Sequence, residues 1–168
     1  MQDLHCDMES LHENPVYPDV LTEYGITYSS SVLPANNPLF GWKEFGPAPR
    51  KMNERLLEIP ITLNKFGLIN IPFAGGVYFR CLPFWFIKTS FRKIFESNQP
   101  VLSYFHPYDV DTEQEKFMHS GINNNKFYNF LMYYNRKNLF KRLNNILKQD
   151  VEVMTFDKYI NTILNNGL

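Results

Sequence analysis

Four short apolar segments with a strand-like pattern are separated by amphipathic helical segments, and this alternation limits the fold more than any other feature of the sequence. The strand-like segments are residues 57–61, 71–79, 101–106 and 151–154. Residues 82–98 and 134–149 instead place apolar side chains at helical spacing. Strands that alternate with helices predict an α/β architecture.

The helical segments are expected to bury one face each. For residues 82–98 this face is Phe84, Ile87, Phe91, Ile94 and Phe95; for residues 134–149 it is Leu139, Phe140, Leu143, Ile146 and Leu147. A short helix from Pro18 to Tyr24, ended by Gly25, and a last helix capped by Thr155 complete the prediction. Residues 29–55, rich in proline, form a long irregular loop in this interpretation.

Charge and length exclude several classes of protein. The 168 residues fit one domain, and equal numbers of basic and acidic residues (17 each) disfavour a nucleic-acid binder. The first 24 residues hold six acids and no base, unlike a signal or transit peptide. No apolar run is long enough to span a membrane. Cys6 and Cys81 form no paired motif, so we expect reduced thiols and a cytoplasmic location.

His106 is the most suggestive candidate for chemistry. It ends the strand-like segment 101–106, and α/β barrels place their active sites at strand ends. Its imidazole can exchange a proton near neutral pH; a plain hydrogen bond to a loop carbonyl is the alternative. We expect the ring to be partly exposed, near Tyr104, Tyr108 or the glycine pair Gly75 and Gly76. That pair lacks the spacing of a nucleotide-binding loop.

Metal ligation has little support in the pattern of histidines. His5, His12, His106 and His119 include no pair at the spacing that places two imidazoles on one helical face. The acidic cluster around His5 and His12 is interpreted as a flexible terminus.

Several segments, taken in order, resemble a known family. They are Tyr24 to Pro34 (YGITYSSSVLP), Leu56 to Pro60 (LLEIP), Ile71 to Pro83 (IPFAGGVYFRCLP) and Tyr104 to Asp111 (YFHPYDVD). Together they resemble the C-terminal portion of bacterial polysaccharide deacetylases of the NodB-homology type, which are carbohydrate esterases. The similarity is greatest to the exopolysaccharide-associated branch with a C-terminal extension. It runs over residues 17–168, and residues 1–16 are expected to be a flexible acidic N-terminus.

The resemblance implies a deformed (β/α) barrel and a divalent metal, usually zinc, held by an Asp and two His. The metal activates water against an N-acetyl or O-acetyl group on a sugar. His106 matches the histidine that protonates the leaving group. We expect Tyr108, Gly75, Gly76 and Tyr78 to contact the substrate, a polysaccharide or oligosaccharide.

Three motifs of that family have no counterpart in this sequence: Thr-Phe-Asp-Asp, His-x-x-x-His and Arg-x-Pro. Ser29 also replaces the Asp of a Tyr-Asp-Ser-Ser segment. We therefore expect the C-terminal half of an incomplete barrel, with no metal or other cofactor bound by this chain alone. Whether it is an enzyme stays open. It would be a truncated or split deacetylase that self-associates or needs a separate N-terminal half.

The sequence also leaves two alternative functions open. The first is a non-catalytic carbohydrate-binding or scaffolding module that stacks sugars on Tyr28, Phe40, Trp42 and Phe45. The second is a protein that binds its partner through its amphipathic helices.

Overall fold

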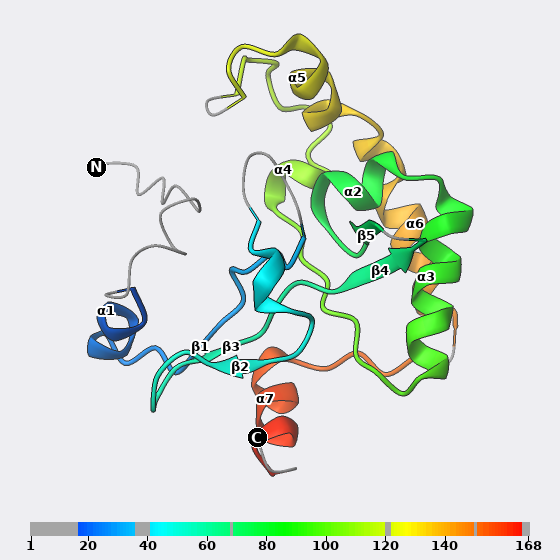
Figure 1. Cartoon of the computed structure of the whole chain (residues 1–168). Helices are drawn as coiled ribbons and strands as arrows, with labels where there is room; N and C mark the ends of the chain where they lie inside the picture. Colours follow the sequence, from blue (N-terminus) through cyan, green and yellow to red (C-terminus); the bar gives the residue numbers. More distant parts are fainter. Residues whose placement is uncertain (1–16, 36–40, 68, 120–121, 150, 166–168) are drawn as a thin grey trace.

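The computed structural model describes residues 17–35, 41–67, 69–119, 122–149 and 151–165. In these ranges the chain has a mixed α/β structure with two small sheets and surrounding helices (Figure 1). Neither sheet closes on itself within these ranges. The α/β class is therefore confirmed. The N-terminal segment 1–16, predicted to be flexible, lies outside the described residues, as do Cys6, His5 and His12.

The first sheet has three strands in the order β1-β3-β2. The strands are β1 (Tyr28–Ser29), β2 (Arg50–Lys51) and β3 (Leu57–Glu58). β1 runs parallel to β3, and β2 runs antiparallel to it. The buried carboxylate of Glu58 accepts the backbone N–H groups of Ser31 and Val32 at 2.7 and 2.8 Å, which fixes the chain after β1. The second sheet is an antiparallel hairpin of β4 (Leu63–Phe66) and β5 (Ile69–Pro72).

The α-helices are α1 (Tyr17–Glu23), α2 (Gly76–Cys81), α3 (Phe84–Glu96), α4 (Pro107–Val110), α5 (Lys126–Tyr133), α6 (Leu139–Leu147) and α7 (Phe156–Asn165). Short 3-10 helices cover Lys43–Phe45 and Arg136–Asn138. The short helix ended by Gly25, which has φ of +76°, is as predicted. Thr155 accepts the N–H of Lys158 and caps α7, again as predicted. None of the described helices has the length and apolar character needed to cross a membrane.

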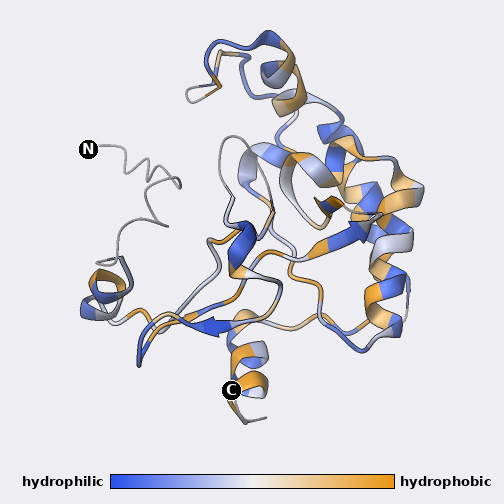
Figure 2. Ribbon diagram, viewed as in Figure 1, coloured by the Kyte–Doolittle hydropathy of each residue, from blue (hydrophilic) through white to orange (hydrophobic). Residues whose placement is uncertain are grey.

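The main core lies between α2, α3 and α6. It buries Phe73, Ala74, Phe79, Phe86, Ile87, Phe91, Leu139 and Ile146. Phe91 is at its centre, edge-on to Phe73 and Phe79 with ring centroids 5.2 and 6.4 Å away. The hydropathy colouring shows apolar stretches of α3 and α6 in this region (Figure 2). The predicted inner face of residues 82–98 is confirmed, with Ile87 fully buried.

A second, smaller core joins the three-stranded sheet to α7 through Leu57, Ile59 and Ile160. Tyr28 in β1 stacks on Phe156 and donates a hydrogen bond to Asp157. Residues far apart in the sequence therefore meet at this end of the molecule.

Three of the predicted strands are wrong or partly wrong. Residues 71–79 split into the end of β5 and the start of α2. Residues 101–106 pack against the main core but pair with no strand. Their backbone groups find other partners: Leu102 N–H donates to the Thr62 hydroxyl at 2.8 Å, and Tyr104 C=O accepts from Gly76 N–H. Residues 151–154 also form no strand, and Val153 is 74% exposed.

The inner face predicted for residues 134–149 is correct only in part. Leu139 and Ile146 are buried and Leu143 packs on the core, whereas Phe140 and Leu147 are exposed. The helix starts five residues later than predicted, at Leu139. Phe140 and Leu147 are seven residues apart, so they lie on one stripe of the helix, next to the stripe that is buried.

Candidate functional site

His106 is the residue before α4 rather than the end of a strand, which corrects the prediction. Pro107 starts the helix, where its missing N–H costs nothing. Asp109, at the third helical position, accepts the backbone N–H of His106 through Oδ2 at 2.9 Å. This reciprocal capping fixes the backbone of His106. The imidazole itself is 50% exposed, as expected from the sequence.

Asp109 is fully buried and paired with Arg80 of α2. Arg80 Nε donates to Asp109 Oδ1 at 2.9 Å, and both side chains are inaccessible to solvent. Asp109 Oδ2 also lies 3.4 Å from Nδ1 of His106. A buried charge pair persists only when its remaining donors and acceptors are well placed. Here both carboxylate oxygens have neighbours.

Arg80 also connects this pair to α5. Its Nη1 donates to the carbonyl oxygens of Leu131 and Tyr134, at 3.2 and 2.6 Å. The last carbonyls of a helix lack partners within the helix and carry partial negative charge, so a guanidinium is well suited to this end. In return, Asn135 donates to the carbonyl oxygen of Arg80.

Aromatic rings flank the His106 imidazole. Tyr108 stacks on it, with centroids 4.9 Å apart and planes 7° from parallel. Tyr104 meets it edge-on at 5.9 Å. Burial raises the pKa of Tyr108, and nearby Asp109 adds to the increase. The imidazole of His106 therefore has one face in contact with Tyr108, while half of the side chain remains exposed.

The glycine pair brings α2 against the segment that precedes His106. Gly76 N–H donates to the carbonyl oxygen of Tyr104 at 3.0 Å. A Cβ at Gly75 would lie 2.2 Å from that same oxygen, and Gly76 has a left-handed φ of +52°. Only glycine allows this approach. The glycine pair therefore allows a close backbone approach between the start of α2 and Tyr104.

Tyr104 is the residue around which the predicted site residues gather. Its pKa is raised to about 12, chiefly by burial. The neighbouring groups of Tyr78, Asp109 and Tyr108 raise it further. The structure therefore brings His106, Tyr108, Gly75, Gly76 and Tyr78 to one region. Their proximity by itself assigns no role to any of these residues.

Sequence reasoning missed Arg80 and Asp109 as parts of the site, whereas Tyr104 lies beside His106 as predicted. Asp109 had a detectable signal, because an acidic residue three positions after a helix start is a capping pattern. Arg80 had none, since it is 29 positions from Asp109 and only the tertiary fold joins them.

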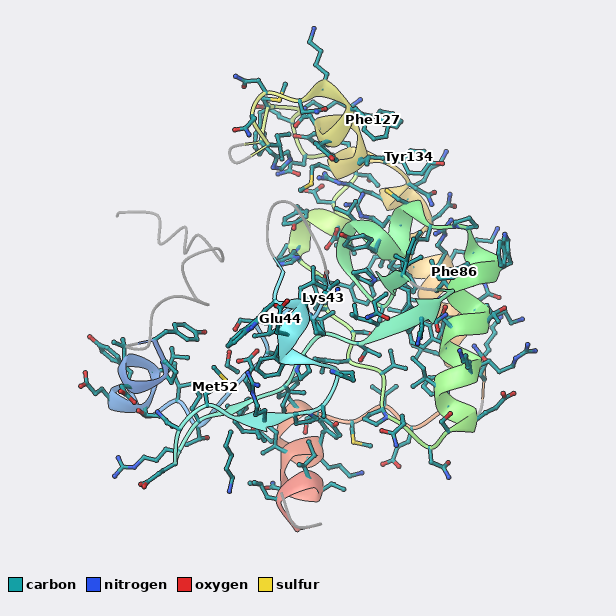
Figure 3. All side chains as sticks on the ribbon, viewed as in Figure 1. Lys43, Glu44, Met52, Phe86, Phe127 and Tyr134 are labelled. Atoms are coloured by element: carbon teal, nitrogen blue, oxygen red, sulfur yellow. The ribbon has the colours of Figure 1, made fainter. Side chains whose placement is uncertain are left out.

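Aromatic contacts continue from Tyr108 toward α5. The ring of His119 lies 6.4 Å from Tyr108 and 5.4 Å from Tyr133. The Arg136 guanidinium lies over Tyr133 at 4.4 Å. Burial, followed by the positive charge of Arg136, lowers the pKa of His119. α5 itself projects from the rest of the molecule (Figure 1), and Figure 3 labels Phe127 on this helix and Tyr134 just after its end.

The described residues do not fit a divalent metal. No three His, Cys, Asp or Glu side chains converge anywhere in the described ranges. Nδ1 of His106 lies 3.4 Å from Oδ2 of Asp109, but the Arg80 guanidinium already contacts the Asp109 carboxylate.

The loop aromatics of the alternative interpretation have partners within the protein. Phe45 is buried, and Trp42 meets it edge-on at 5.2 Å. The Arg50 guanidinium lies over both rings. Tyr28 stacks on Phe156. Phe40, the fourth of these aromatics, lies outside the described residues.

The protein is thus a mixed α/β chain in which the half-exposed His106 lies beside the buried Arg80–Asp109 pair. Residues 30–161 match a family model described as a domain of unknown function, DUF3473. The match covers more than half of the chain, so the protein belongs to this family. Comparisons with curated proteins and with solved structures gave no match.

Proposed function

We propose that the chain is the C-terminal part of a polysaccharide deacetylase-like hydrolase, an incomplete (β/α) barrel, with His106 as the general acid of acetyl-group removal. The observation that carries the proposal is the setting of His106. Its backbone is fixed by Asp109, its ring is stacked on Tyr108, and half of its side chain remains exposed. A proton donor must be held in place and still reach its substrate.

The reaction breaks the bond between the acetyl carbon and the sugar nitrogen or oxygen. Water adds to the acetyl carbonyl, and the tetrahedral intermediate then collapses to acetate. His106 gives its proton to the departing amine or alcohol as that bond breaks. The substrate is an acetylated polysaccharide or oligosaccharide, bound beside Tyr108, Tyr78 and the glycine pair.

No three His, Cys, Asp or Glu side chains converge among the described residues to hold a metal that would activate water. The water-activating group is therefore a separate part of the proposal. We propose that a separate N-terminal half supplies it. The full chain alone should then bind acetylated sugars without releasing acetate.

The test is a titration of the full chain with acetylated glucosamine oligomers, followed by NMR, with fully deacetylated oligomers as the control. The expected result is that the acetylated form shifts the signals of His106, Tyr108, Gly75 and Gly76 more than the deacetylated form. The proposal is overturned if neither oligomer shifts these signals.

A second measurement follows acetate in the same samples. No acetate should appear, with or without added zinc. Zinc-dependent acetate release that His106→Ala abolishes would show that the chain is a complete deacetylase and that the split-enzyme proposal is wrong.

A further inference from the structure

We propose that a surface cavity between the start of α3 and α6 binds a carboxylate-bearing sugar, such as a uronate residue of an acidic polysaccharide. The cavity is lined by Phe84, Asn138, Lys141, Arg142 and Asn145. This site is separate from His106 and goes beyond the proposed function, so its test uses a sugar without acetyl groups.

The size of the cavity fits one sugar ring. Its volume is about 230 Å³. Sites for drug-sized ligands usually have roughly 300–1,000 Å³. A space just below this range has room for a single ring, with the neighbouring rings of a polymer outside it.

The charge of the cavity favours an anion. Its lining has two basic side chains and no acidic one: Lys141 is exposed and Arg142 is partly buried. The ion pairs formed among the described residues include neither of them. α6 itself contains no acidic residue. The cavity therefore carries positive charge that a carboxylate would compensate.

Arg142 is held in a fixed position with donors to spare. Its Nη1 donates to the carbonyl oxygens of Phe79 and Leu82 at 2.8 and 2.9 Å, and its guanidinium lies over the Phe84 ring. Burial lowers the pKa of this guanidinium, so an anion beside it would stabilise the charged form. Nε and Nη2 have no acceptor among the described residues. These two donors lie on one edge of the guanidinium and suit a bidentate contact with a carboxylate.

The two asparagines add acceptors that suit the hydroxyl groups of a sugar. Nδ2 of Asn138 donates to Asn135 at 2.6 Å, and Nδ2 of Asn145 donates to the Lys141 carbonyl at 2.8 Å. Their amide oxygens receive no hydrogen bond from the part of the chain that the structure describes. A sugar hydroxyl can donate to such an oxygen, whereas a phosphodiester brings acceptors only. The Phe84 ring provides an apolar wall for the C–H groups of the sugar.

The cavity and the region around His106 lie at opposite ends of α2. Arg142 contacts Phe79 and Leu82 at the C-terminal end of this helix, whereas Gly76 begins it next to Tyr104. A helix of six residues spans about 9 Å. The two sites therefore share no residue, although a chain of a few sugars has the length to contact both.

The experiment is an NMR titration of the ¹⁵N-labelled full chain with tetragalacturonate at about pH 7, where its carboxyl groups are ionised. The neutral galactose tetramer of the same linkage is the ligand control. Tetragalacturonate should shift the Arg142 Nε–H signal and the side-chain amide signals of Asn138 and Asn145. The neutral tetramer should bind at least about tenfold more weakly, because hydrogen bonds to charged groups are the stronger ones.

Two variants test the lining of the cavity. Lys141→Glu, an exposed substitution, should weaken binding of tetragalacturonate by at least about tenfold. Lys51→Glu makes the same change of charge on the exposed strand β2 and should weaken it by less than about twofold. Asn145→Ala removes one acceptor and should weaken binding by about fivefold, the usual worth of one neutral hydrogen bond.

The proposal is overturned if tetragalacturonate leaves these signals unchanged, if the neutral tetramer binds equally well, or if the two lysine variants weaken binding alike. Tighter binding of a short oligothymidylate or of tetraglutamate at the same signals would show a nucleic-acid or peptide surface and would overturn it too. His106→Ala should bind tetragalacturonate as the wild type does. Since the probe has no acetyl group, failure here leaves the proposed function intact, and failure of the acetylated oligomers to bind leaves this site intact.

Discussion

The ring of Tyr108 lies parallel to the imidazole of His106, with centroids 4.9 Å apart and planes 7° from parallel. The two residues are separated only by Pro107, whose fixed φ limits how the chain can turn between them. One face of the imidazole is therefore covered by an aromatic ring, and its motion is restricted from that side.

Removal of this ring should release the imidazole. In Tyr108→Leu, the ring protons of His106 should lose the upfield shift that a stacked aromatic ring causes, and the free energy of unfolding should fall by about 1 kcal/mol, the usual worth of an aromatic pair. Tyr108→Phe keeps the stacked ring and should retain the shift. One-dimensional NMR of the histidine ring protons checks this, and an equal shift in all three proteins would contradict it.

A methyl group at Gly75 should be poorly tolerated. Its Cβ would lie 2.2 Å from the backbone oxygen of Tyr104, which cannot move without disturbing the segment before His106. Gly75→Ala should lower the free energy of unfolding by about 3 kcal/mol, the upper end for overpacking.

Gly67→Ala is the matched control for this substitution. Gly67 has open space around it but a left-handed φ of +62°, so the cost should be only about 1–2 kcal/mol. Urea denaturation of both variants compares the cost of the close contact at Gly75 with the cost of the left-handed backbone at Gly67. A smaller loss for Gly75→Ala than for Gly67→Ala would show that the close contact with Tyr104 is absent.

The Arg80–Asp109 pair should matter far more to stability than an exposed pair of the same chemistry. Arg80→Met leaves the buried Asp109 carboxylate without its partner and should cost about 3–5 kcal/mol. Arg92→Met on α3 removes a pair with Glu96 in which both side chains are mostly exposed, and should cost at most about 1 kcal/mol. Thermal and urea unfolding measure both. Equal losses would contradict the buried network.

Alkaline pH should destabilise the fold through Tyr104. Its pKa is raised from 10.0 to about 12, first by burial, so the unfolded chain loses this proton at lower pH than the folded one. The stabilisation is therefore complete below about pH 10 and is lost as pH rises toward 12, by roughly 2–3 kcal/mol. Tyr104→Phe should show a weaker decline between about pH 10 and pH 12. An identical decline in both proteins, measured by urea unfolding, would rule out this cause.

Local signals in the sequence predicted the elements that depend on local chemistry. Gly25 ends α1 because a left-handed residue is needed there, and Thr155 caps α7 with its hydroxyl. For the segment 101–106, local signals predict burial but not the hydrogen-bond partners of the backbone. Its apolar residues do pack on the core, but the partners of its backbone are a threonine hydroxyl and a glycine N–H from distant segments. Hydrophobic pattern reports burial and says nothing of which backbone groups will pair.

Helix α5 was missed although a signal was present. The sequence analysis predicts no helix over residues 126–133, yet the Asn125 side chain accepts the N–H groups of Phe127 and Tyr128 and starts the helix. In the site, the positions of His106 and the glycine pair were found from their residue types. Arg80 was not, because only the tertiary structure places it beside Asp109.

The isolated protein should self-associate through its exposed apolar side chains. Large apolar side chains remain exposed on α3, α5, α6 and β5: Ile69, Trp85, Phe127, Phe130 and Phe140 are each more than half exposed. Exposed apolar side chains of this size favour contact with another chain. At micromolar concentration the protein should elute with a mass above that of the 19.9 kDa monomer by light scattering. The double variant Phe127→Ser/Phe130→Ser, on a helix that buries no side chain of its own, should reduce that mass without unfolding the core. Tyr24→Ser, which removes a single exposed ring next to α1, should leave it unchanged. A sharp monomer peak for the wild-type chain, with cooperative thermal unfolding, would show that these surfaces need no partner.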